Sequence, residues 1–375
     1  MEMSESNRQK TVFITGGGTG GHIYPAIAVA NALREAGCKI FYVGNPKNLE
    51  KEIAQREGFD FLEVDISGMP RRADFGVFKW MWKLFVATSK ALGYILKYKP
   101  DMVFGTGGYV SAPALFASVL TKTPFATHDC DAAPGIVSKT VAPFAKFVSL
   151  AFEGSKNCVK SRKAVCFGNP IRKEFSQIDK IAARGELNLL NKPTLLVMGG
   201  SQGAKTLNKA LIYTLEDLFK EFDIQIIHQT GRKNYDETLE MLEKIYPAYK
   251  ENNNYILRPY FDRMFTPLIA ADIAFTRAGS LSISELCAAG AASILVPYPY
   301  AAADHQRKNA REMEKHHAAI YLEDRDCNSA NLYKILRDLF NSPTEITLLQ
   351  EKAKSLAKPY ATREITAEIL NIINC

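Results

Sequence analysis

The chain has 375 residues, of which 47% are hydrophobic and 23% charged, and its formal net charge is +7. This composition is ordinary for a folded soluble protein, and the length favours two domains. The polar N-terminus and the lack of a long apolar run argue against a signal peptide or membrane span, and seven scattered cysteines favour a reduced cytoplasmic protein without a structural metal.

A glycine loop joins the first predicted strand to the first predicted helix. The apolar run 11–14 is predicted to be a buried strand, residues 15–21 (TGGGTGG) form the loop, and the helix is expected to open near Pro25. Glycines allow close approach of an anion, and a helix start offers unpaired N–H groups. The loop therefore predicts a site for a phosphate-bearing ligand or acidic acceptor; the alternative is a tight turn without a ligand.

The same loop satisfies the G-x-G-x-x-G pattern of dinucleotide-binding domains through Gly16, Gly18 and Gly21. A NAD site also needs an acidic residue at the end of the second strand, to hold the ribose hydroxyls. That strand, residues 39–45 (KIFYVGN), has no carboxylate. A dehydrogenase is therefore the least favoured enzyme class.

A short basic segment, residues 71–99, carries nearly the whole excess of positive charge and both tryptophans. Aromatic residues recur in it at helical spacing, and lysines flank them. One interpretation is a core-facing helix with a solvated back; the other is a patch that docks on an anionic membrane surface. Nucleic-acid binding is disfavoured because no nucleic-acid motif accompanies the patch. The residues assigned to the membrane patch are Phe78, Trp82, Phe85, Lys79 and Lys83.

A second strand, glycine loop and helix follow at residues 101–120, with the loop at 105–111 (GTGGYVS). Two helix starts are therefore expected near the same edge of one sheet. A strand at 125–127 brings the run His-Asp-Cys-Asp at 128–131 to that edge, and the domain is expected to end in a short strand near 165–170.

Residues 194–204 (TLLVMGGSQGA) begin a second domain, because they repeat the strand and Gly-Gly order of residues 11–17. Further strands are predicted at 224–228, 255–257, 273–275 and 293–296, and a helical tail near 359–375 is expected to pack back on the first domain. The predicted fold class is α/β, with two doubly wound Rossmann-like domains, 1–170 and 171–358, facing a cleft. That is the GT-B architecture of sugar-nucleotide glycosyltransferases.

Six motifs then occur in a fixed order: GGTGGH at 17–22, GTGGYVS at 105–111, GNPIR at 168–172, GGSQGA at 199–204, TRAG at 276–279 followed by SE at 284–285, and DHQ at 304–306 followed by NA at 309–310. Together they resemble the MurG family. These enzymes add N-acetylglucosamine from UDP-N-acetylglucosamine to undecaprenyl-pyrophosphoryl-N-acetylmuramoyl-pentapeptide in peptidoglycan synthesis. The resemblance implies an inverting hexosyltransferase, peripheral on the cytoplasmic face of the plasma membrane. No site for a protein-held metal is evident in the sequence, so we expect no cofactor or metal.

The resemblance also implies roles for individual residues. The acceptor side is expected at Thr19, Gly20, Gly21, Gly107, Gly108 and Tyr109. In the donor site, Arg172 is expected at the departing UDP, Ser201 at the diphosphate, Glu285 at the ribose, the backbone of Phe261 at uracil and Gln306 at the sugar. Further substrate-binding positions are His128, Asp131, Arg277, Ser280 and Leu281.

His22 is the first candidate for the catalytic base, because imidazole titrates near neutral pH and His22 directly follows the first loop. Asp131 is a second catalytic candidate. The family usually has His-Glu-x-Asn where this chain has His-Asp-Cys-Asp at 128–131, so a carboxylate replaces the amide expected near the donor sugar.

Other interpretations stay open at this stage. Ser282-x-x-Glu285 also fits a capping box, Ser201 fits a helix cap, and Arg172 fits an exposed linker arginine. An enzyme with the same fold but a diacylglycerol acceptor is one alternative function. A non-catalytic sugar-nucleotide-binding or membrane-docking subunit is another.

Overall fold

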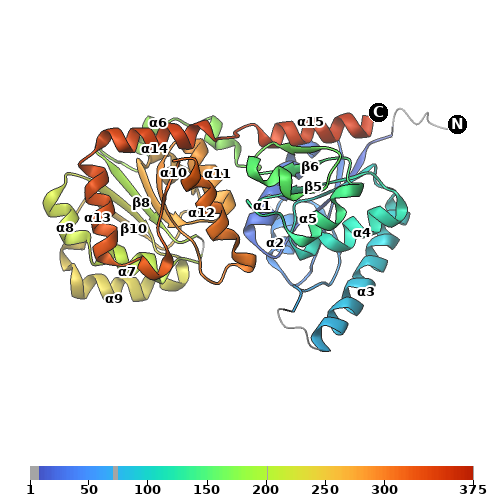
Figure 1. The fold of residues 1–375 in the computed structure, drawn as a ribbon, viewed down its shortest axis with the longest axis horizontal. Helices are drawn as coiled ribbons and strands as arrows, with labels where there is room; N and C mark the ends of the chain where they lie inside the picture. Colours follow the sequence, from blue (N-terminus) through green and yellow to red (C-terminus); the bar gives the residue numbers. More distant parts are fainter. Residues whose placement is uncertain (1–7, 71–74, 201, 375) are drawn as a thin grey trace. The chain divides into compact units, whose positions relative to one another are not determined.

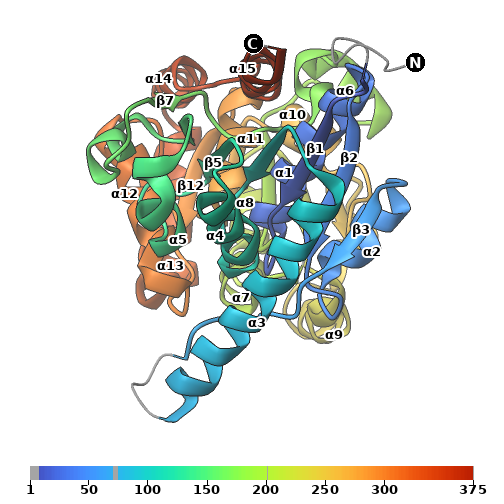
Figure 2. The same cartoon turned by 90° about the vertical axis from the view of Figure 1, so that its right-hand side faces the viewer.

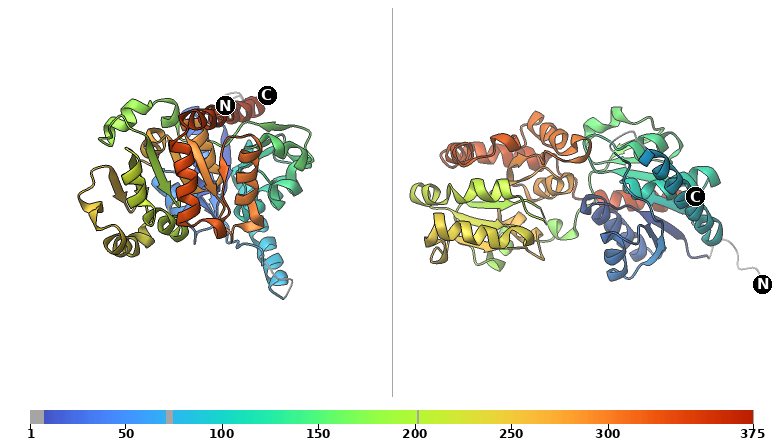
Figure 3. Two further views of the ribbon diagram at one scale, coloured as in Figure 1. Left: turned by 60° about the vertical axis from the view of Figure 1, so that its left-hand side comes forward. Right: turned by 90° about the horizontal axis from the view of Figure 1, so that it is seen from below.

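The computed structural model describes residues 8–70, 75–200 and 202–374, which form two compact units (Figure 1). The first unit contains the chain up to Ile171 and again from Tyr360 onward, and the second is Arg172–Pro359. Each unit is a parallel sheet with helices on both faces (Figure 3). Within the described residues, no helix is at once long enough and apolar enough to cross a membrane.

The described part of the first unit contains a seven-stranded sheet in the order β3-β2-β1-β4-β5-β6-β7, with every pairing parallel. The order reverses between β1 and β4, the position at which ligands bind in doubly wound folds. Both glycine loops of this unit leave the sheet at that position. The strands are β1 (Thr11–Thr15), β2 (Lys39–Gly44), β3 (Asp60–Glu63), β4 (Met102–Gly105), β5 (Phe125–Asp129), β6 (Val148–Leu150) and β7 (Ala164–Cys166).

Side chains of the first sheet alternate between two apolar layers. Val12 and Ile14 pack with α1 and α15, whereas Phe13 packs with α3 and α4. Helix α15 contacts α1 and contributes the buried Ile365 and Ile369, so the end of the described chain completes this core. The helices are α1 (Gly20–Glu35), α2 (Leu49–Arg56), α3 (Phe75–Tyr98), α4 (Ala112–Thr121), α5 (Ile136–Val141) and α15 (Ala361–Asn374).

Helix α1 begins at Gly20, so the expectation that it opens near Pro25 is wrong. Proline inside a helix has no N–H for the carbonyl four residues earlier, which here is that of Gly21. The thiol of Cys130 donates to this carbonyl, with Sγ 3.2 Å from the oxygen. A thiol from the residue that follows β5 therefore replaces the hydrogen bond that Pro25 cannot make.

Helix α3 packs on the unit through its C-terminal half, and its N-terminal half extends away from the sheet (Figure 2). The buried stripe is Ala87, Ala91 and Ile95. The aromatic stripe is exposed, at 73% for Phe78, 68% for Trp82 and 62% for Phe85. The interpretation of this aromatic face as core-facing is therefore wrong, because the opposite, buried stripe belongs to the apolar cluster that also contains residues of α4.

Lys83 lies on the flank of α3 that faces the body of the unit. Its Nζ is 2.8 Å from Oδ1 of Asp65, which also pairs with Lys47. The two lysines hold the pKa of the Asp65 carboxyl below its ordinary value. The structure therefore neutralises Lys83 within the protein, whereas the sequence suggested a cation facing lipid.

The second unit repeats the arrangement around a sheet in the order β10-β9-β8-β11-β12-β13, six parallel strands in its described residues. The order reverses between β8 and β11, where the third glycine loop and the start of α11 lie. The strands are β8 (Thr194–Met198), β9 (Gln225–Gln229), β10 (Tyr255–Arg258), β11 (Ile273–Arg277), β12 (Ala292–Val296) and β13 (Ile320–Tyr321). The helices are α6 (Lys180–Glu186), α7 (Lys205–Ile212), α8 (Leu215–Glu221), α9 (Tyr235–Ile245), α10 (Phe265–Ala270), α11 (Ser280–Ala289), α12 (His305–Lys315), α13 (Ser329–Phe340) and α14 (Pro343–Ser355).

Candidate active site

The two glycine loops of the first unit pack backbone against backbone at the carboxyl ends of β1 and β4. Gly107 and Gly108 have φ of +87° and +72°, a region that glycine enters without strain. A Cβ atom on Gly108 would lie 2.4 Å from the carbonyl oxygen of Gly17. Gly108 is thus required by this close approach and Gly107 by its positive φ, and the second loop lies against the start of α1, where Thr19 is the N-cap.

His22 lies in the first turn of α1, half-buried beside the second loop. Its Nδ1 is 2.9 Å from the carbonyl oxygen of Thr106, and the Thr106 hydroxyl donates to the His22 carbonyl at 2.6 Å. Because a carbonyl oxygen only accepts, Nδ1 must carry the proton of the neutral ring. The Nε2 atom of His22 is therefore the nitrogen that can accept a proton, as a general base must.

His128 is fully buried at the end of β5 and does not reach the surface of the site. Its Nδ1 is 2.8 Å from Oγ of Ser149 and its Nε2 is 2.9 Å from Oδ1 of Asn169. Burial lowers the pKa of His128 to about 4, so the ring is neutral. With both ring nitrogens bonded to Ser149 and Asn169 inside the protein, the His128 side chain is not placed to contact a substrate.

The run 128–131 brings two carboxylates to the same region with different surroundings. Asp129 is buried, accepts a hydrogen bond from the Gly135 N–H at 2.8 Å, and has its pKa raised, chiefly by burial. Asp131 is half-buried, and its negative charge raises the pKa of Asp129 further, whereas the charge of His22 lowers it. His22 and Asp131 therefore lie close enough to Asp129 for both to act on its pKa.

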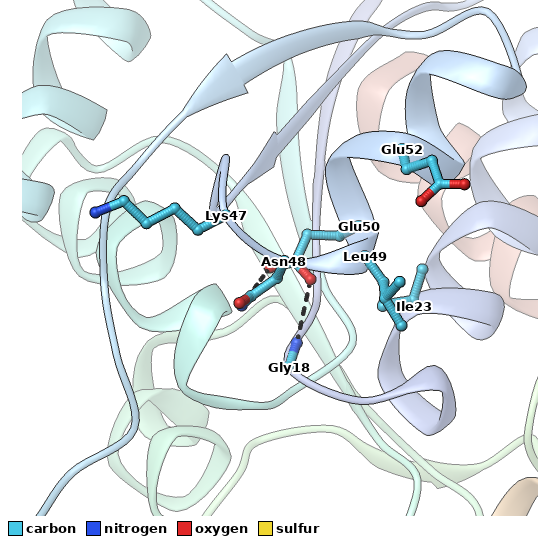
Figure 4. A pocket seen from close by; sticks show the side chains of 7 residues that line it. All are labelled: Gly18, Ile23, Lys47, Asn48, Leu49, Glu50 and Glu52. Atoms are coloured by element: carbon cyan, nitrogen blue, oxygen red, sulfur yellow. Dashed lines mark hydrogen bonds between the residues drawn. The ribbon is translucent and has the colours of Figure 1, made fainter. Parts of the chain in front are cut away.

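A hollow of about 390 Å³ opens beside the first loop (Figure 4). Glu50 is fully buried in its wall, and its carboxylate accepts from the Gly18 N–H at 3.4 Å and from Nδ2 of Asn48 at 3.1 Å. Asn48 also donates to the hydroxyl of Tyr109 at 3.2 Å, which ties the two loops together. Neither Asn48 nor Glu50 was predicted as a site residue from the sequence, although an asparagine before an acidic helical turn is a signal for a helix start. The hollow is lined by Gly18, Ile23, Lys47, Asn48, Leu49, Glu50 and Glu52.

The corresponding edge of the second unit carries the loop after β8 and the start of α11. Gly203 has φ of +77°, and a Cβ atom on it would lie 1.9 Å from the Thr230 carbonyl oxygen, so the loop packs tightly on the end of β9. Ser201, predicted to bind the diphosphate, lies outside the described residues. Gly279 is the N-cap of α11, and Ser280 and Leu281 form its first turn, where helix N–H groups favour an anion.

Glu285 lies further along α11, almost fully buried. Because the N-cap is Gly279, Ser282 and Glu285 are both inside the helix, and the capping-box interpretation is wrong. The Nε atom of Arg172 is 3.7 Å from Oε1 of Glu285, and this oxygen has no hydrogen-bond partner among the described residues. Burial raises the pKa of Glu285 to about 7, although the charge of Arg172 opposes the shift.

Two further residues predicted for the sugar-donor site make hydrogen bonds within the second unit. The backbone N–H of Phe261 donates to Oε1 of Gln229 at 2.9 Å. Oε1 of Gln306 accepts from the Tyr298 N–H at 2.9 Å, which leaves the Gln306 amide NH₂ as the group that can donate to a ligand.

Arg277 links the segment after β12 to Asp324 through its guanidinium group. Its Nη1 is 2.5 Å from Oδ1 of Asp324 and donates to the Pro297 carbonyl at 3.2 Å, and its side chain is 12% exposed. The guanidinium expected at a substrate is thus engaged by the protein itself. Among the described residues, no group of three His, Cys, Asp or Glu side chains is placed to hold a metal ion.

Comparison with known proteins identifies the family. The model of the glycosyltransferase family 28 N-terminal domain matches residues 12–149, and that of the C-terminal domain matches residues 194–365. A protein of Halothermothrix orenii, named UDP-N-acetylglucosamine–N-acetylmuramyl-(pentapeptide) pyrophosphoryl-undecaprenol N-acetylglucosamine transferase, is 37% identical over 94% of this chain and 96% of its own. A Caldanaerobacter subterraneus protein of the same name is also 37% identical, over 93% of this chain and 96% of its own. The chain belongs to the MurG family.

Solved structures agree with this membership. The crystal structure of Acinetobacter baumannii MurG superposes with a TM-score of 0.80 at 28% identity, covering 96% of this chain and 99% of that one. The UDP-GlcNAc 2-epimerase of Neisseria meningitidis has a TM-score of 0.68 at 11% identity, over 97% of this chain, which shows a shared fold alone. The two-domain GT-B fold and the MurG-family glycosyltransferase assignment predicted from the six motifs are therefore confirmed.

Proposed function

We propose that this MurG-family enzyme transfers N-acetylglucosamine from UDP-N-acetylglucosamine to the 4-hydroxyl of undecaprenyl-pyrophosphoryl-N-acetylmuramoyl-pentapeptide. One observation carries the proposal. Each sheet reverses its strand order at a glycine loop followed by a helix start, which gives each unit its own anion-binding edge. This suits a reaction in which donor and acceptor each carry a diphosphate, and the names of the relatives specify both.

The acceptor diphosphate is assigned to the first unit. The N–H groups of Thr19, Gly20 and Gly21 at the start of α1 and those of Gly107 and Gly108 supply neutral donors for it. Tyr109 fixes the second loop through Asn48. The Nε2 atom of His22 takes the hydroxyl proton as the oxygen attacks the sugar, and Asp131 is the second candidate for this step.

The donor is assigned to the second unit. The bond from the muramoyl oxygen to the anomeric carbon forms as the bond from that carbon to the UDP oxygen breaks, so the leaving group departs with the electron pair. Arg172 and the start of α11 stabilise the departing charge. In this assignment, Glu285 accepts hydrogen bonds from the ribose hydroxyls and the Phe261 backbone binds uracil. The loop that contains Ser201 binds the diphosphate, and the Gln306 NH₂ donates to the sugar.

We further place the protein at the cytoplasmic face of the plasma membrane, with helix α3 as the docking element. Phe78, Trp82 and Phe85 are exposed on one stripe, where monomeric proteins rarely gather large apolar side chains. Lys79 is exposed beside them and adds attraction to anionic lipid. The extension of the N-terminal half of α3 from its unit gives these side chains access to a headgroup layer (Figure 2).

The test is transfer of labelled N-acetylglucosamine from its UDP donor to a short-chain lipid-linked muramoyl-pentapeptide, with diacylglycerol as the parallel acceptor. We expect disaccharide on the muramoyl lipid alone, and we expect turnover to persist with EDTA because Arg172 and helix N–H groups supply the positive charge. Product on diacylglycerol alone would refute the acceptor. UDP-sugar binding without any product would favour a non-catalytic binding subunit.

A further inference from the structure

The side chain of Gln229 occupies a special position at the carboxyl edge of the second sheet. Gln229 is the last residue of β9, and in the sheet register it lies between Met198 of β8 and Arg258 of β10. The loop 199–204 leaves β8 at this level, and the segment 259–264 leaves β10 at the same level. Gln229 is only 2% exposed, so its amide has to find its partners within the protein.

The amide of Gln229 links these two segments directly. Its Oε1 accepts from the Phe261 N–H at 2.9 Å, and its Nε2 donates to the Gly200 carbonyl at 3.4 Å. The Gly200 carbonyl also accepts from the Gly203 N–H at 3.0 Å, which closes the turn of the loop. A primary amide alone among uncharged side chains of this length offers one donor and one acceptor in this geometry.

The far side of the same loop is held by other residues. Nδ2 of Asn234 donates to the Gln202 carbonyl at 3.1 Å, and Nδ2 of Asn208 donates to the Thr230 carbonyl at 3.0 Å. Asn208 is oriented in turn by the buried ring of His228, whose Nε2 is 3.1 Å from Oδ1 of Asn208. Of the described residues named here, Gln229 is the one whose side chain joins the loop to the segment that contains Phe261.

We propose that Gln229 is a positioning residue that couples the base-binding segment of the UDP site to its diphosphate loop. The inference rests on the proposed assignment of Phe261 and of loop 199–204 to UDP. When uracil takes the Phe261 N–H, Oε1 of Gln229 loses its partner, and the amide that also holds Gly200 is released to reorient. Recognition of the base therefore changes the diphosphate loop before any phosphate touches it.

The first test uses the wild-type protein and uridine, which has no phosphate. We expect millimolar uridine to change amide hydrogen exchange in peptides that cover loop 199–204 as well as in those that cover 259–264. An unchanged loop under conditions where uridine protects 259–264 would overturn the coupling. Failure of the wild type to bind UDP or transfer sugar would instead refute the proposed function, so the two failures are distinct.

The second test replaces the amide. Gln229→Leu removes both hydrogen bonds, so we expect faster exchange at 259–264 without ligand, loss of the uridine effect on loop 199–204, and a rise of about tenfold in KM for UDP-N-acetylglucosamine with kcat within about twofold. Gln229→Glu keeps an acceptor for Phe261 but cannot donate to Gly200, so it should retain slow exchange at 259–264 and still lose the effect on the loop. Normal coupling in either variant would overturn the proposal.

Gln225→Leu is the matched control. Gln225 is the first residue of the same strand and is 3% exposed, and its amide bonds the backbone of Leu190 with both Oε1 (2.7 Å) and Nε2 (3.0 Å). The control loses a buried amide of the same strand at the opposite edge of the sheet. It should lower the melting temperature but leave donor KM and the uridine effect unchanged, and an equal rise in KM would show that Gln229 acts through stability alone.

Discussion

Glu285 is a carboxyl group whose burial opposes its ionisation. Its pKa is raised to about 7, so between pH 4.5 and 7 the folded protein keeps a proton that the unfolded chain releases. The free energy of unfolding therefore falls as pH rises through this window and stays lower above it. We expect Glu285→Gln to stabilise the ligand-free protein by up to about 3 kcal/mol at pH 8 and by little at pH 4.5, measured by thermal unfolding at both values.

The same substitution should weaken UDP binding, because a neutral amide replaces the charged carboxylate that accepts hydrogen bonds from the ribose hydroxyls. We expect a tenfold to hundredfold loss of affinity, roughly the range for a hydrogen bond to a charged group, measured by calorimetry at pH 8. Glu243→Gln is the control, because Lys250 lowers the pKa of this exposed carboxyl and it lies away from the site. A Glu285→Gln protein that is less stable than wild type at pH 8 would contradict the argument.

Two substitutions distinguish His22 from Asp131 as the candidate catalytic base. Because the Thr106 carbonyl fixes the proton of His22 on Nδ1 and leaves Nε2 to accept one, we expect His22→Ala to lower kcat by about 10² to 10⁴, with donor KM within about twofold. Asp131→Asn restores the amide usual in the family and should keep kcat within a few-fold. The reverse ranking in steady-state assays would make Asp131 the base.

At the scale of an element, helix α3 has a buried stripe that packs on the first unit and an exposed aromatic stripe on the opposite side. We expect Phe78→Ser, Trp82→Ser and Phe85→Ser together to reduce binding to phosphatidylglycerol-containing vesicles by at least about tenfold in a sedimentation assay, because three exposed aromatic side chains are lost. Melting temperature should hold, because none of the three lies in the core.

Ile181→Ser provides the control for α3. Ile181 is 84% exposed on α6 in the second unit, so this variant also removes an exposed apolar side chain. Its vesicle binding should equal that of the wild type. Equal binding of the triple variant and the wild type would refute α3 as the docking element.

The glycine loops could be predicted from the sequence because only glycine fits where two backbone segments approach closely. Gly108 and Gly203 are examples, since a Cβ atom at either position would clash with a backbone carbonyl. It predicted α3 as a helix but left two orientations open, since an aromatic stripe at helical spacing suits both a core and a surface. The start of α1 was misplaced because the Cys130 thiol that compensates for Pro25 lies far along the chain. Strands β6 and β13 have only three and two residues, too few for a pattern.

At the scale of the whole molecule, the repeated strand and Gly-Gly order at residues 11–17 and 194–200 predicted two sheets of one design, and the structure has them. The buried polar partners could not be predicted in the same way. The ring of His228, for example, bonds Tyr255 and Asn208, which are distant from it along the chain. Local pattern determined the elements, whereas these pairs depend on how the elements are packed.

Helix α15 gives the molecule a particular order of assembly. Its apolar residues Ile365, Ile369 and Ile373 belong to the core of the first unit, yet the whole second unit, residues 172–359, precedes them in the chain. Because the ribosome synthesises the chain from its N-terminus, the face of α1 that α15 will cover stays exposed while the second unit is made. During that interval the core of the first unit is incomplete, and its exposed apolar face needs α15, or a chaperone in its place, to shield it.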